Sequence, residues 1–133
     1  MKVTALVFTA ASLAGLALGK TDSDVCWKKN QNVVKAIQGF CSYSNIVVPS
    51  DYAKNGYHVG QYGNHDTTVS ISGDCSPPQW VPHRYCMSQS YNMCANGKTR
   101  GDMNLRQYGR NGCQRWHVLV GKIGSHGACP DCI

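Results

Sequence analysis

One short motif near the C-terminus has the spacing of a redox centre. Cys129-Pro130-Asp131-Cys132 matches the Cys-x-x-Cys dithiol, whose chemistry depends on a thiolate of low pKa at the start of a helix. Here the motif ends a chain with eight cysteines, an even number that is typical of structural disulfides in a short secreted protein. A zinc site is not expected, because no second Cys-x-x-Cys exists to complete a ligand set.

Residue types that serve in hydrolysis are present, but their pattern does not favour an enzyme. Residues 123–127, IGSHG, are similar to a G-x-S-x-G nucleophile elbow, yet the first glycine is replaced by isoleucine, and the segment is interpreted as a turn. The five histidines and the arginines have the residue types of a small ribonuclease. However, the chain has no glutamate, which is the base of guanyl-type fungal ribonucleases, and glycosidase chemistry would have to use two of seven aspartates. We therefore predict no catalytic residues, no metal and no cofactor.

A polar and aromatic stretch, Asp51–Asp66 (DYAKNGYHVGQYGNHD), contains the residue types of a sugar-binding surface. Aromatic faces pack against the apolar face of a pyranose ring, while Asn, Asp and His side chains bond its hydroxyls in a shallow site. With almost nothing to bury, the stretch is predicted to form an exposed loop or hairpin. Alternatively, it forms a hairpin whose tyrosines pack on a sheet and bind nothing. The candidate glycan-binding residues are Tyr57, Tyr62, Asn64 and Asp66, assisted by Trp80.

The candidate binding residues must be positioned by helices and strands, and the chain is organised around one segment, Gly73–Gly97. This segment contains three cysteines, three prolines and Trp80. Each proline fixes its own φ and favours extended geometry in the residue before it, so a stiff, irregular segment carrying Trp80 is expected first. A helix at about His83 to Ala95 is expected next. Pro82 is suited to its first turn, and Asn96-Gly97 is suited to its end.

Two cysteines of this helix are predicted to anchor it. Cys86 and Cys94 are separated by about 80° around a helix, so both can face one core and join the helix to two other parts of the chain. Tyr85 and Met93 are expected to be buried with them.

An earlier helix is predicted at about Asp24 to Gln38. A carboxylate at its start can cap it, and Val33, Val34 and Ile37 recur at helical spacing. Gly39 is positioned to end this helix, and Cys41 can fasten its exit.

Short extended segments make up the rest of the pattern. In Thr67–Ser72 and Arg115–Lys122 apolar and polar residues alternate, which fits antiparallel strands covered on one side by helices. Val69 and Ile71 would share the covered face with Trp116, Val118 and Val120. The predicted fold class is α+β, a single small domain with one antiparallel β-sheet and two main helices, stapled by four disulfides. The other predicted strands are 45–48, 56–59 and 104–108.

Residues 1–19 have the form of a secretory signal peptide. A short positive region precedes the apolar run Val3–Leu18, and Ala17-Leu18-Gly19 has the small-x-small pattern of a cleavage site. No second apolar run of that length occurs, so membrane insertion is not expected. Residues 20–133 then form one cysteine-rich domain, and the product is predicted to be secreted and extracellular.

The charge pattern does not favour nucleic acid as a partner. Without the signal peptide, twelve Lys and Arg oppose seven Asp, a net charge of +5. Lys28-Lys29 is the only adjacent basic pair, so the chain lacks a polybasic run of the kind that binds nucleic acid or anionic membranes.

All eight cysteines are predicted to form disulfides, and each long-range bridge typically stabilises a small domain by about 2 to 4 kcal/mol. Their pairing cannot be read from the sequence. We expect Cys129 and Cys132 to bond to two distant partners rather than to each other. The eight are Cys26, Cys41, Cys75, Cys86, Cys94, Cys113, Cys129 and Cys132.

The order of several motifs resembles one known family. A helix with Cys26-Trp27 is followed by SGDCSPPQWVP (72–82), by a Cys86 and Cys94 helix ending in MCANG (93–97), and by YGRNGCQRWHV (108–118). This layout, which covers most of the mature chain, is similar to that of the Y3-like small secreted fungal glycan-binding proteins. The resemblance implies a single α/β domain with four disulfides, glycan binding without a cofactor, and a homodimer.

The predicted function is therefore non-enzymatic binding of glycans or glycoproteins, as in a lectin. The alternative is a secreted effector or toxin-like protein that acts on a host or competitor protein. Both have the same framework and differ only in the surface that binds the target.

Overall fold

Four α-helices, one short 3-10 turn and six strands make up the part of the chain that the computed structural model describes, residues 19–60 and 66–121. The helices are α1 (Asp22–Lys29), α2 (Gln31–Cys41), α3 (Asp51–Asn55) and α4 (His83–Asn96), and the 3-10 turn is η2 (Arg110–Gly112). The strands are β1 (Val47–Val48), β2 (Tyr57–Val59), β3 (Asp66–Gly73), β4 (Gln79–Trp80), β5 (Met103–Tyr108) and β6 (Gln114–Gly121).

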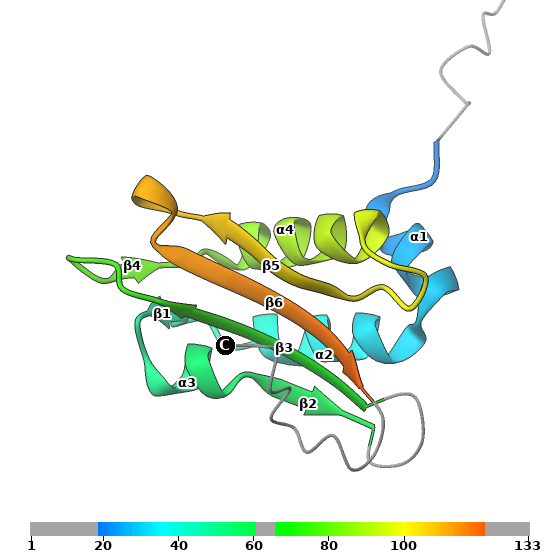
Figure 1. Ribbon diagram of the computed structural model, residues 1–133, viewed down its shortest axis with the longest axis horizontal. Coiled ribbons are helices and arrows are strands. Elements are labelled where there is room, and N and C mark those ends of the chain that lie inside the picture. Colours follow the sequence, from blue (N-terminus) through cyan, green and yellow to red (C-terminus); the bar gives the residue numbers. More distant parts are fainter. Residues whose placement is uncertain (1–18, 61–65, 122–133) are drawn as a thin grey trace, which may run out of the picture.

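The strands form two antiparallel sheets rather than the single sheet that we expected. The larger has the order β2-β3-β6-β5, and the smaller pairs β1 with β4. The small sheet exists because the proline-rich segment after β3 leaves the large sheet, so that Gln79 and Trp80 pair with Val48 and Val47 instead. β4 thereby lies at one end of the molecule, next to the turn η2 (Figure 1). The α+β class is confirmed.

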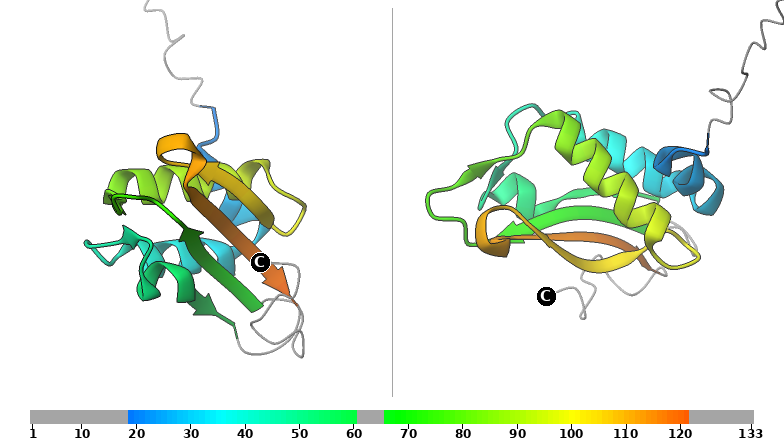
Figure 2. Two further views of the ribbon diagram at one scale, coloured as in Figure 1. Left: turned by 60° about the vertical axis from the view of Figure 1, so that its left-hand side comes forward. Right: turned by 90° about the horizontal axis from the view of Figure 1, so that it is seen from above.

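The helices cover one face of the large sheet, as the alternating pattern predicted (Figure 2). Val69 and Ile71 of β3 are buried opposite Val118 and Trp116 of β6, which are their register partners. From the helices, Ile37 and Phe40 of α2 and Met93 of α4 complete the core and are fully buried. Apolar burial of this kind is the main driving force that holds the layers together.

The predicted helix from Asp24 to Gln38 is in fact two helices, and Asn30 separates them. Asn30 has extended backbone angles (φ −164°, ψ 108°), and its N–H donates to Cys26 O to end α1. Its side-chain Oδ1 then accepts from the N–H of Asn32 and caps α2. The continuous prediction was wrong because the apolar pattern gave no sign of an internal cap, although Asn is among the best N-cap residues.

The short helix α3 was also missed, within the stretch that we expected to be a loop or hairpin. Ser50 Oγ accepts from the N–H of Ala53, and Gly56 ends the helix at a positive φ of 73°. Ala53 is fully buried, and the Tyr52 ring stacks on Phe40, so the stretch does contribute to the core. The hairpin part of the prediction holds, since β2 pairs with β3.

Helix α4 agrees with its prediction to within one residue, and both of its cysteines anchor it. Cys86 bonds to Cys41 at the end of α2, and Cys94 bonds to Cys26 in α1. All four of these cysteine side chains are fully buried. The expected roles of Cys41, Cys86 and Cys94 are thus confirmed, and Met93 is buried as predicted.

A third disulfide, Cys75–Cys113, joins the segment before β4 to the residue that follows η2. The six cysteines of the described residues are therefore paired among themselves. Cys129 and Cys132 lie outside the described residues. The expectation that each of them bonds to a distant cysteine is wrong, because all six distant cysteines already have partners.

The predicted signal segment 1–19 lies outside the described residues apart from Gly19, as does the turn predicted at residues 123–127. Of the helices in the described ranges, none combines the length and apolar character needed to span a membrane.

Candidate functional site

Trp80 is a large, exposed aromatic side chain whose orientation is fixed. Its side chain is 60% exposed, and its indole N–H donates to the carbonyl of Ser44 at 3.0 Å. The backbone beneath it is held by the pairing with Val47, and Pro78 and Pro82 restrict the chain close by on both sides. Trp80 therefore presents an apolar ring to solvent with little loss of conformational freedom on binding a ligand.

Tyr85, in the first turn of α4, lines the same groove as Trp80. Its side chain is 44% exposed, which corrects our expectation that it would be buried. Arg84 holds it in place, because the guanidinium lies 4.7 Å from the ring centroid and donates to the tyrosine hydroxyl at 3.1 Å. The prediction failed because Cys86 takes the core-facing position of this turn, and the neighbouring position must then point away from the core.

The floor of this groove is a chain of hydrogen-bonded amides. Trp116 Nε1 donates to Gln114 Oε1 at 2.8 Å, and Gln114 Nε2 donates to Gln79 Oε1 at 3.1 Å. Gln79 Oε1 accepts a second bond from the backbone N–H of Arg110, also at 3.1 Å. Because its oxygen is held twice, the Gln79 amide has a defined direction, and its NH2 group is a preorganised donor.

We call this depression the Trp80 groove. It lies between β4, the start of α4 and the turn η2, and has a volume of about 470 Å³, within the range typical of small-molecule sites. Aromatic and proline rings form its apolar part, and amides and one guanidinium form its polar part. It is lined by Pro78, Gln79, Trp80, Val81, Pro82, Tyr85, Gln89, Gly109, Arg110, Gln114 and Trp116.

The Cys75–Cys113 disulfide joins the two chain segments that carry Gln79 and Arg110. It ties the proline-rich segment before β4 to the residue after η2, so Gln79 and Arg110 lie close together although they are far apart in sequence. Gly109, with φ of 79°, is also needed here, since a Cβ atom would lie 2.5 Å from Gln79 Oε1. The groove is therefore largely preformed.

The other predicted glycan-binding residues lie elsewhere. Tyr57 in β2 is 41% exposed, and its ring packs closely against Gly39 of α2. Asp66, at the start of β3, has a carboxylate oxygen 2.6 Å from Nε2 of His58. Tyr62 and Asn64 lie outside the described residues. The structure does not bring Tyr57 and Asp66 together, because Tyr57 is the register partner of the buried Val69, whereas Asp66 lies at the start of β3, beyond the end of the β2 pairing. Trp80 lies at the other end of the sheet (Figure 1).

His117 is a buried histidine of β6, and it lies outside the groove. One ring nitrogen bonds Ser72 Oγ at 3.2 Å, and the other donates to the Asn104 carbonyl. Burial lowers the pKa of His117 below its usual value of 6.5; the hydrogen bond to Asn104 opposes this shift, and nearby Arg115 adds to it. A neutral histidine beside a hydroxyl is also found in nucleophilic sites. Here the two hydrogen bonds of His117 link β6 to β3 and to β5. We therefore assign His117 a structural role, in which it holds the three strands together.

Most of the Trp80 groove could not be found from the sequence. Trp80 was singled out because it is a tryptophan between prolines, but Gln79, Tyr85 and Arg110 carry no local signal of binding. They converge only through the β1–β4 pair and the Cys75–Cys113 bond, and disulfide pairing cannot be deduced from spacing alone.

Within residues 19–60 and 66–121, no group of three His, Cys, Asp or Glu side chains is placed to hold a metal ion. Comparison of the chain with protein-family models, with characterised proteins and with solved structures finds no match.

Proposed function

We propose that this protein is a secreted, non-enzymatic glycan-binding protein and that the Trp80 groove is its principal sugar site. The observation that carries the proposal is an exposed, hydrogen-bonded indole next to an exposed tyrosine in a groove floored by oriented amides. Sugar rings present an apolar face and a rim of hydroxyls, which these two kinds of surface complement. Secretion is part of the proposal, supported by three disulfides, which form and persist in oxidising compartments.

In the proposed complex a pyranose ring packs on Trp80, with Tyr85 beside it. The amide of Gln79 and the side chains of Gln89 and Arg110 are placed to bond hydroxyls, since all line the same groove. The groove contains no aspartate among its described residues, so a neutral sugar is favoured over a cationic one. A single shallow site of this kind binds with a dissociation constant on the order of 1 mM, equivalent to about 4 kcal/mol.

The test is a glycan array followed by titration calorimetry on the best neutral glycan. Trp80→Ala should weaken binding about tenfold or more, because aromatic side chains at the centre of a site contribute most of the binding energy. Tyr85→Ala should weaken it by a smaller factor. Both side chains are largely exposed, so both melting temperatures should stay within a few degrees of wild type.

Trp27→Ala is the matched control, since Trp27 is an exposed tryptophan outside the groove. It should leave neutral-glycan binding unchanged. Tyr62→Ala and Asn64→Ala, measured in the same array, test the other predicted surface. If these two variants lose binding while Trp80→Ala keeps it, the Trp80 groove is not the sugar site. If wild type binds no glycan, the proposal fails and the effector alternative, with a protein target, is favoured.

A further inference from the structure

A second aromatic groove lies at the junction of α1 and α2, and the proposed function does not use it. We call it the Trp27 groove. Its volume is about 520 Å³, and Trp27, Lys28, Gln31 and Arg100 line it together with the residues that join the two helices. The Trp27 side chain is 46% exposed, although the preceding Cys26 is fully buried in a disulfide. The ring is therefore attached to a rigid point of the fold.

The residues around this groove are held by bonds between distant segments. Asn30 Nδ2 donates to the carbonyl of Arg100 at 3.2 Å, which ties the helix junction to the turn that carries Arg100. That turn is closed by the N–H of Lys98 bonding the Asp102 carbonyl at 2.9 Å. Gly101, at φ of 77°, lets the turn lie against the Cys94 sulfur. Arg100 thus has a fixed backbone position beside Trp27.

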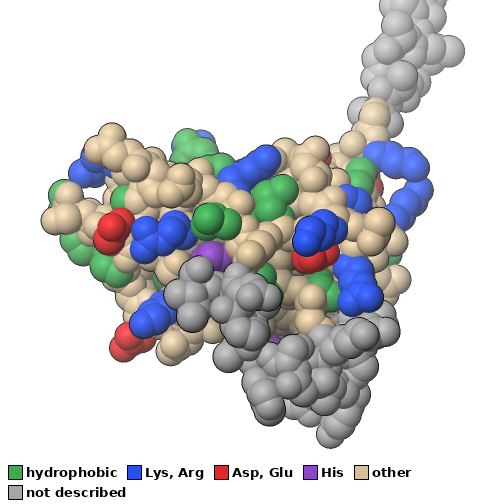
Figure 3. All heavy atoms as spheres, viewed as in Figure 1, with side chains coloured by type: hydrophobic (Ala, Val, Ile, Leu, Met, Phe, Trp, Pro, Cys, Tyr) green, Lys and Arg blue, Asp and Glu red, His purple; other side chains and the backbone are tan. Residues whose placement is uncertain are grey.

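The groove has an excess of positive charge, which a nearby aspartate only partly offsets. Of the described residues that line it, none is acidic. Lys29 is already used, because its ammonium donates to three carbonyls at the end of α4: those of Cys94, Ala95 and Gly97. Lys28 and Arg100 have exposed side chains. The ammonium of Lys20 lowers the pKa of Lys28, and Asp24 only partly offsets this repulsion. Figure 3 shows several Lys and Arg side chains at this end of the molecule.

We propose that the Trp27 groove is a second saccharide site, selective for acidic sugars that carry a sulfate or carboxylate group. The sugar ring packs on Trp27, the anionic group lies between Lys28 and Arg100, and the Gln31 amide bonds a hydroxyl. This inference rests on the proposed glycan-binding function but concerns a separate ligand class. An anion placed here also relieves the repulsion between the two neighbouring ammonium groups.

Two competing modes of binding are distinguished by the test. A basic protein attracts any polyanion through its overall field, without a specific site. An exposed tryptophan with cations also fits single-stranded nucleic acid, whose bases stack on aromatic rings. The sugar is favoured because, of the described residues that line the groove, only Lys28 and Arg100 are exposed cations, which suits one anionic group rather than a row of phosphates.

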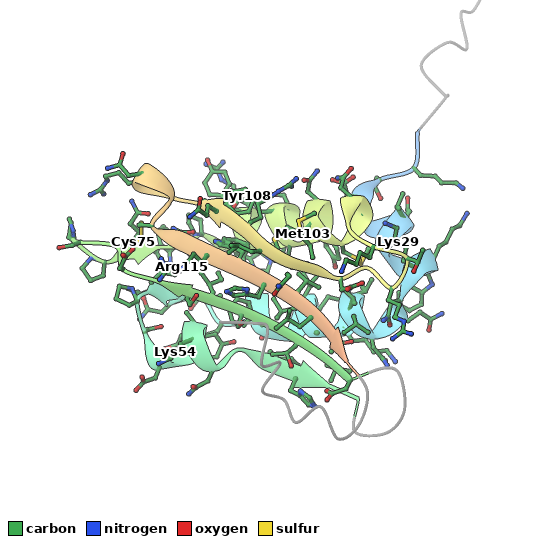
Figure 4. The ribbon with its side chains drawn as sticks, viewed as in Figure 1. Lys29, Lys54, Cys75, Met103, Tyr108 and Arg115 are labelled. Carbon is green, nitrogen blue, oxygen red and sulfur yellow. A yellow bond between two sulfur atoms is a disulfide. The ribbon has the colours of Figure 1, made fainter. Side chains whose placement is uncertain are left out.

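The Trp27 groove and the Trp80 groove lie at opposite ends of the molecule, which allows binding at two points. Figure 4 shows Cys75, beside the Trp80 groove, at one end of the molecule, and Lys29, beside the Trp27 groove, at the other. Two weak sites on one rigid domain can bind two places on a glycan surface, which raises the overall affinity without a dimer.

The experiment compares dextran sulfate with unmodified dextran of the same length, because the two differ only in the anionic group. We expect wild type to bind dextran sulfate at least tenfold more tightly at about 0.15 M salt, where unspecific charge attraction is screened. Lys28→Gln and Arg100→Gln should each weaken that binding about fivefold to tenfold. Lys54→Gln removes an equal charge from α3, away from Lys29 (Figure 4), and should change it less than twofold.

Trp27→Ala is the decisive variant, since it removes the stacking face without changing charge. It should weaken dextran sulfate binding about fivefold or more, a larger loss than Trp80→Ala causes. Binding of the neutral glycan to Trp80→Ala is a separate measurement, so the proposal for the Trp80 groove and the proposal for the Trp27 groove are tested independently. The inference is overturned if Trp27→Ala binds dextran sulfate like wild type, or if Lys54→Gln weakens binding as much as Lys28→Gln. It is also overturned if a single-stranded oligonucleotide binds more tightly than dextran sulfate and loses affinity in the same variants.

Discussion

Single polar side chains bond across strands on the face of the large sheet that the helices leave uncovered. His117 bonds a hydroxyl on β3 and a carbonyl on β5, and His58 lies between Asp66 and Thr68. His117 is nevertheless buried. A buried imidazole that bonds as a neutral group makes the fold sensitive to acid, because the unfolded chain takes up a proton that the folded chain resists.

We predict that acid lowers the free energy of unfolding through His117. The pKa of His117 is depressed in the folded state, chiefly by burial. The contribution of the neutral imidazole to the free energy of unfolding is therefore fully present above the ordinary value of 6.5. It is lost progressively as the pH falls below 6.5 toward the lower folded pKa. Urea unfolding at a series of pH values from about neutral to about 5 measures the effect.

The matched variant is His117→Gln, which keeps a side chain able to bond its neighbours but cannot be protonated. We expect a lower free energy of unfolding at neutral pH and a smaller loss on acidification than in wild type. An identical pH slope in the two proteins would show that another group is responsible.

At the scale of elements, helix ends decide the arrangement of the first half of the chain. Asn30 ends α1, caps α2 and bonds the Arg100 turn, so one residue sets the angle between two helices. Because α1 and α2 are each short, they depend on caps and on tertiary packing more than a single long helix would.

Asn30→Ala should therefore lower the free energy of unfolding by about 1 kcal/mol, the usual cost of losing an N-cap. Asn30→Ser is the control, since a serine hydroxyl can also accept from the second or third N–H of the helix. It should recover most of that loss. Urea denaturation of the three proteins makes the comparison, and equal stabilities for the Ala and Ser variants would rule out the capping role.

The sequence predicted best the elements that are held by periodic burial. Helix α4 and the paired faces of β3 and β6 follow from the spacing of cysteines and apolar residues, and both were placed correctly. Elements held by caps were missed: the break at Asn30 and the helix begun by Ser50 depend on one side chain each. The candidate site was predicted only through Trp80, since its other members converge by pairing between distant segments.

At the scale of the whole molecule, three disulfides cross-link elements that are far apart in sequence. Cys26–Cys94 and Cys41–Cys86 attach α1 and α2 to α4, and Cys75–Cys113 closes the end that carries the Trp80 groove. The pairing explains why a domain of this size can keep two preformed grooves.

We predict that the secreted protein begins near Lys20 and contains no free thiol. For a fourth disulfide within one chain only Cys129 and Cys132 remain, since the other six cysteines are paired. Intact mass before and after alkylation under denaturing conditions, without reduction, should be identical. Peptide mapping should recover the three described pairs. Alkylated Cys129 or Cys132 would contradict the prediction and would support the redox interpretation of the motif.

The order of the three disulfides has a consequence for proteolysis. The Cys26–Cys94 loop encloses Cys41–Cys86, and Cys75–Cys113 overlaps both, so every peptide bond between Cys26 and Cys113 lies inside at least one disulfide loop. A protease that cuts the backbone once anywhere in that span opens a loop but releases no fragment. The turn between α4 and β5, where Lys98 and Arg100 are exposed, can therefore be nicked while the two pieces stay joined covalently. The core packed between α2, α4 and the sheet then keeps the pieces in register.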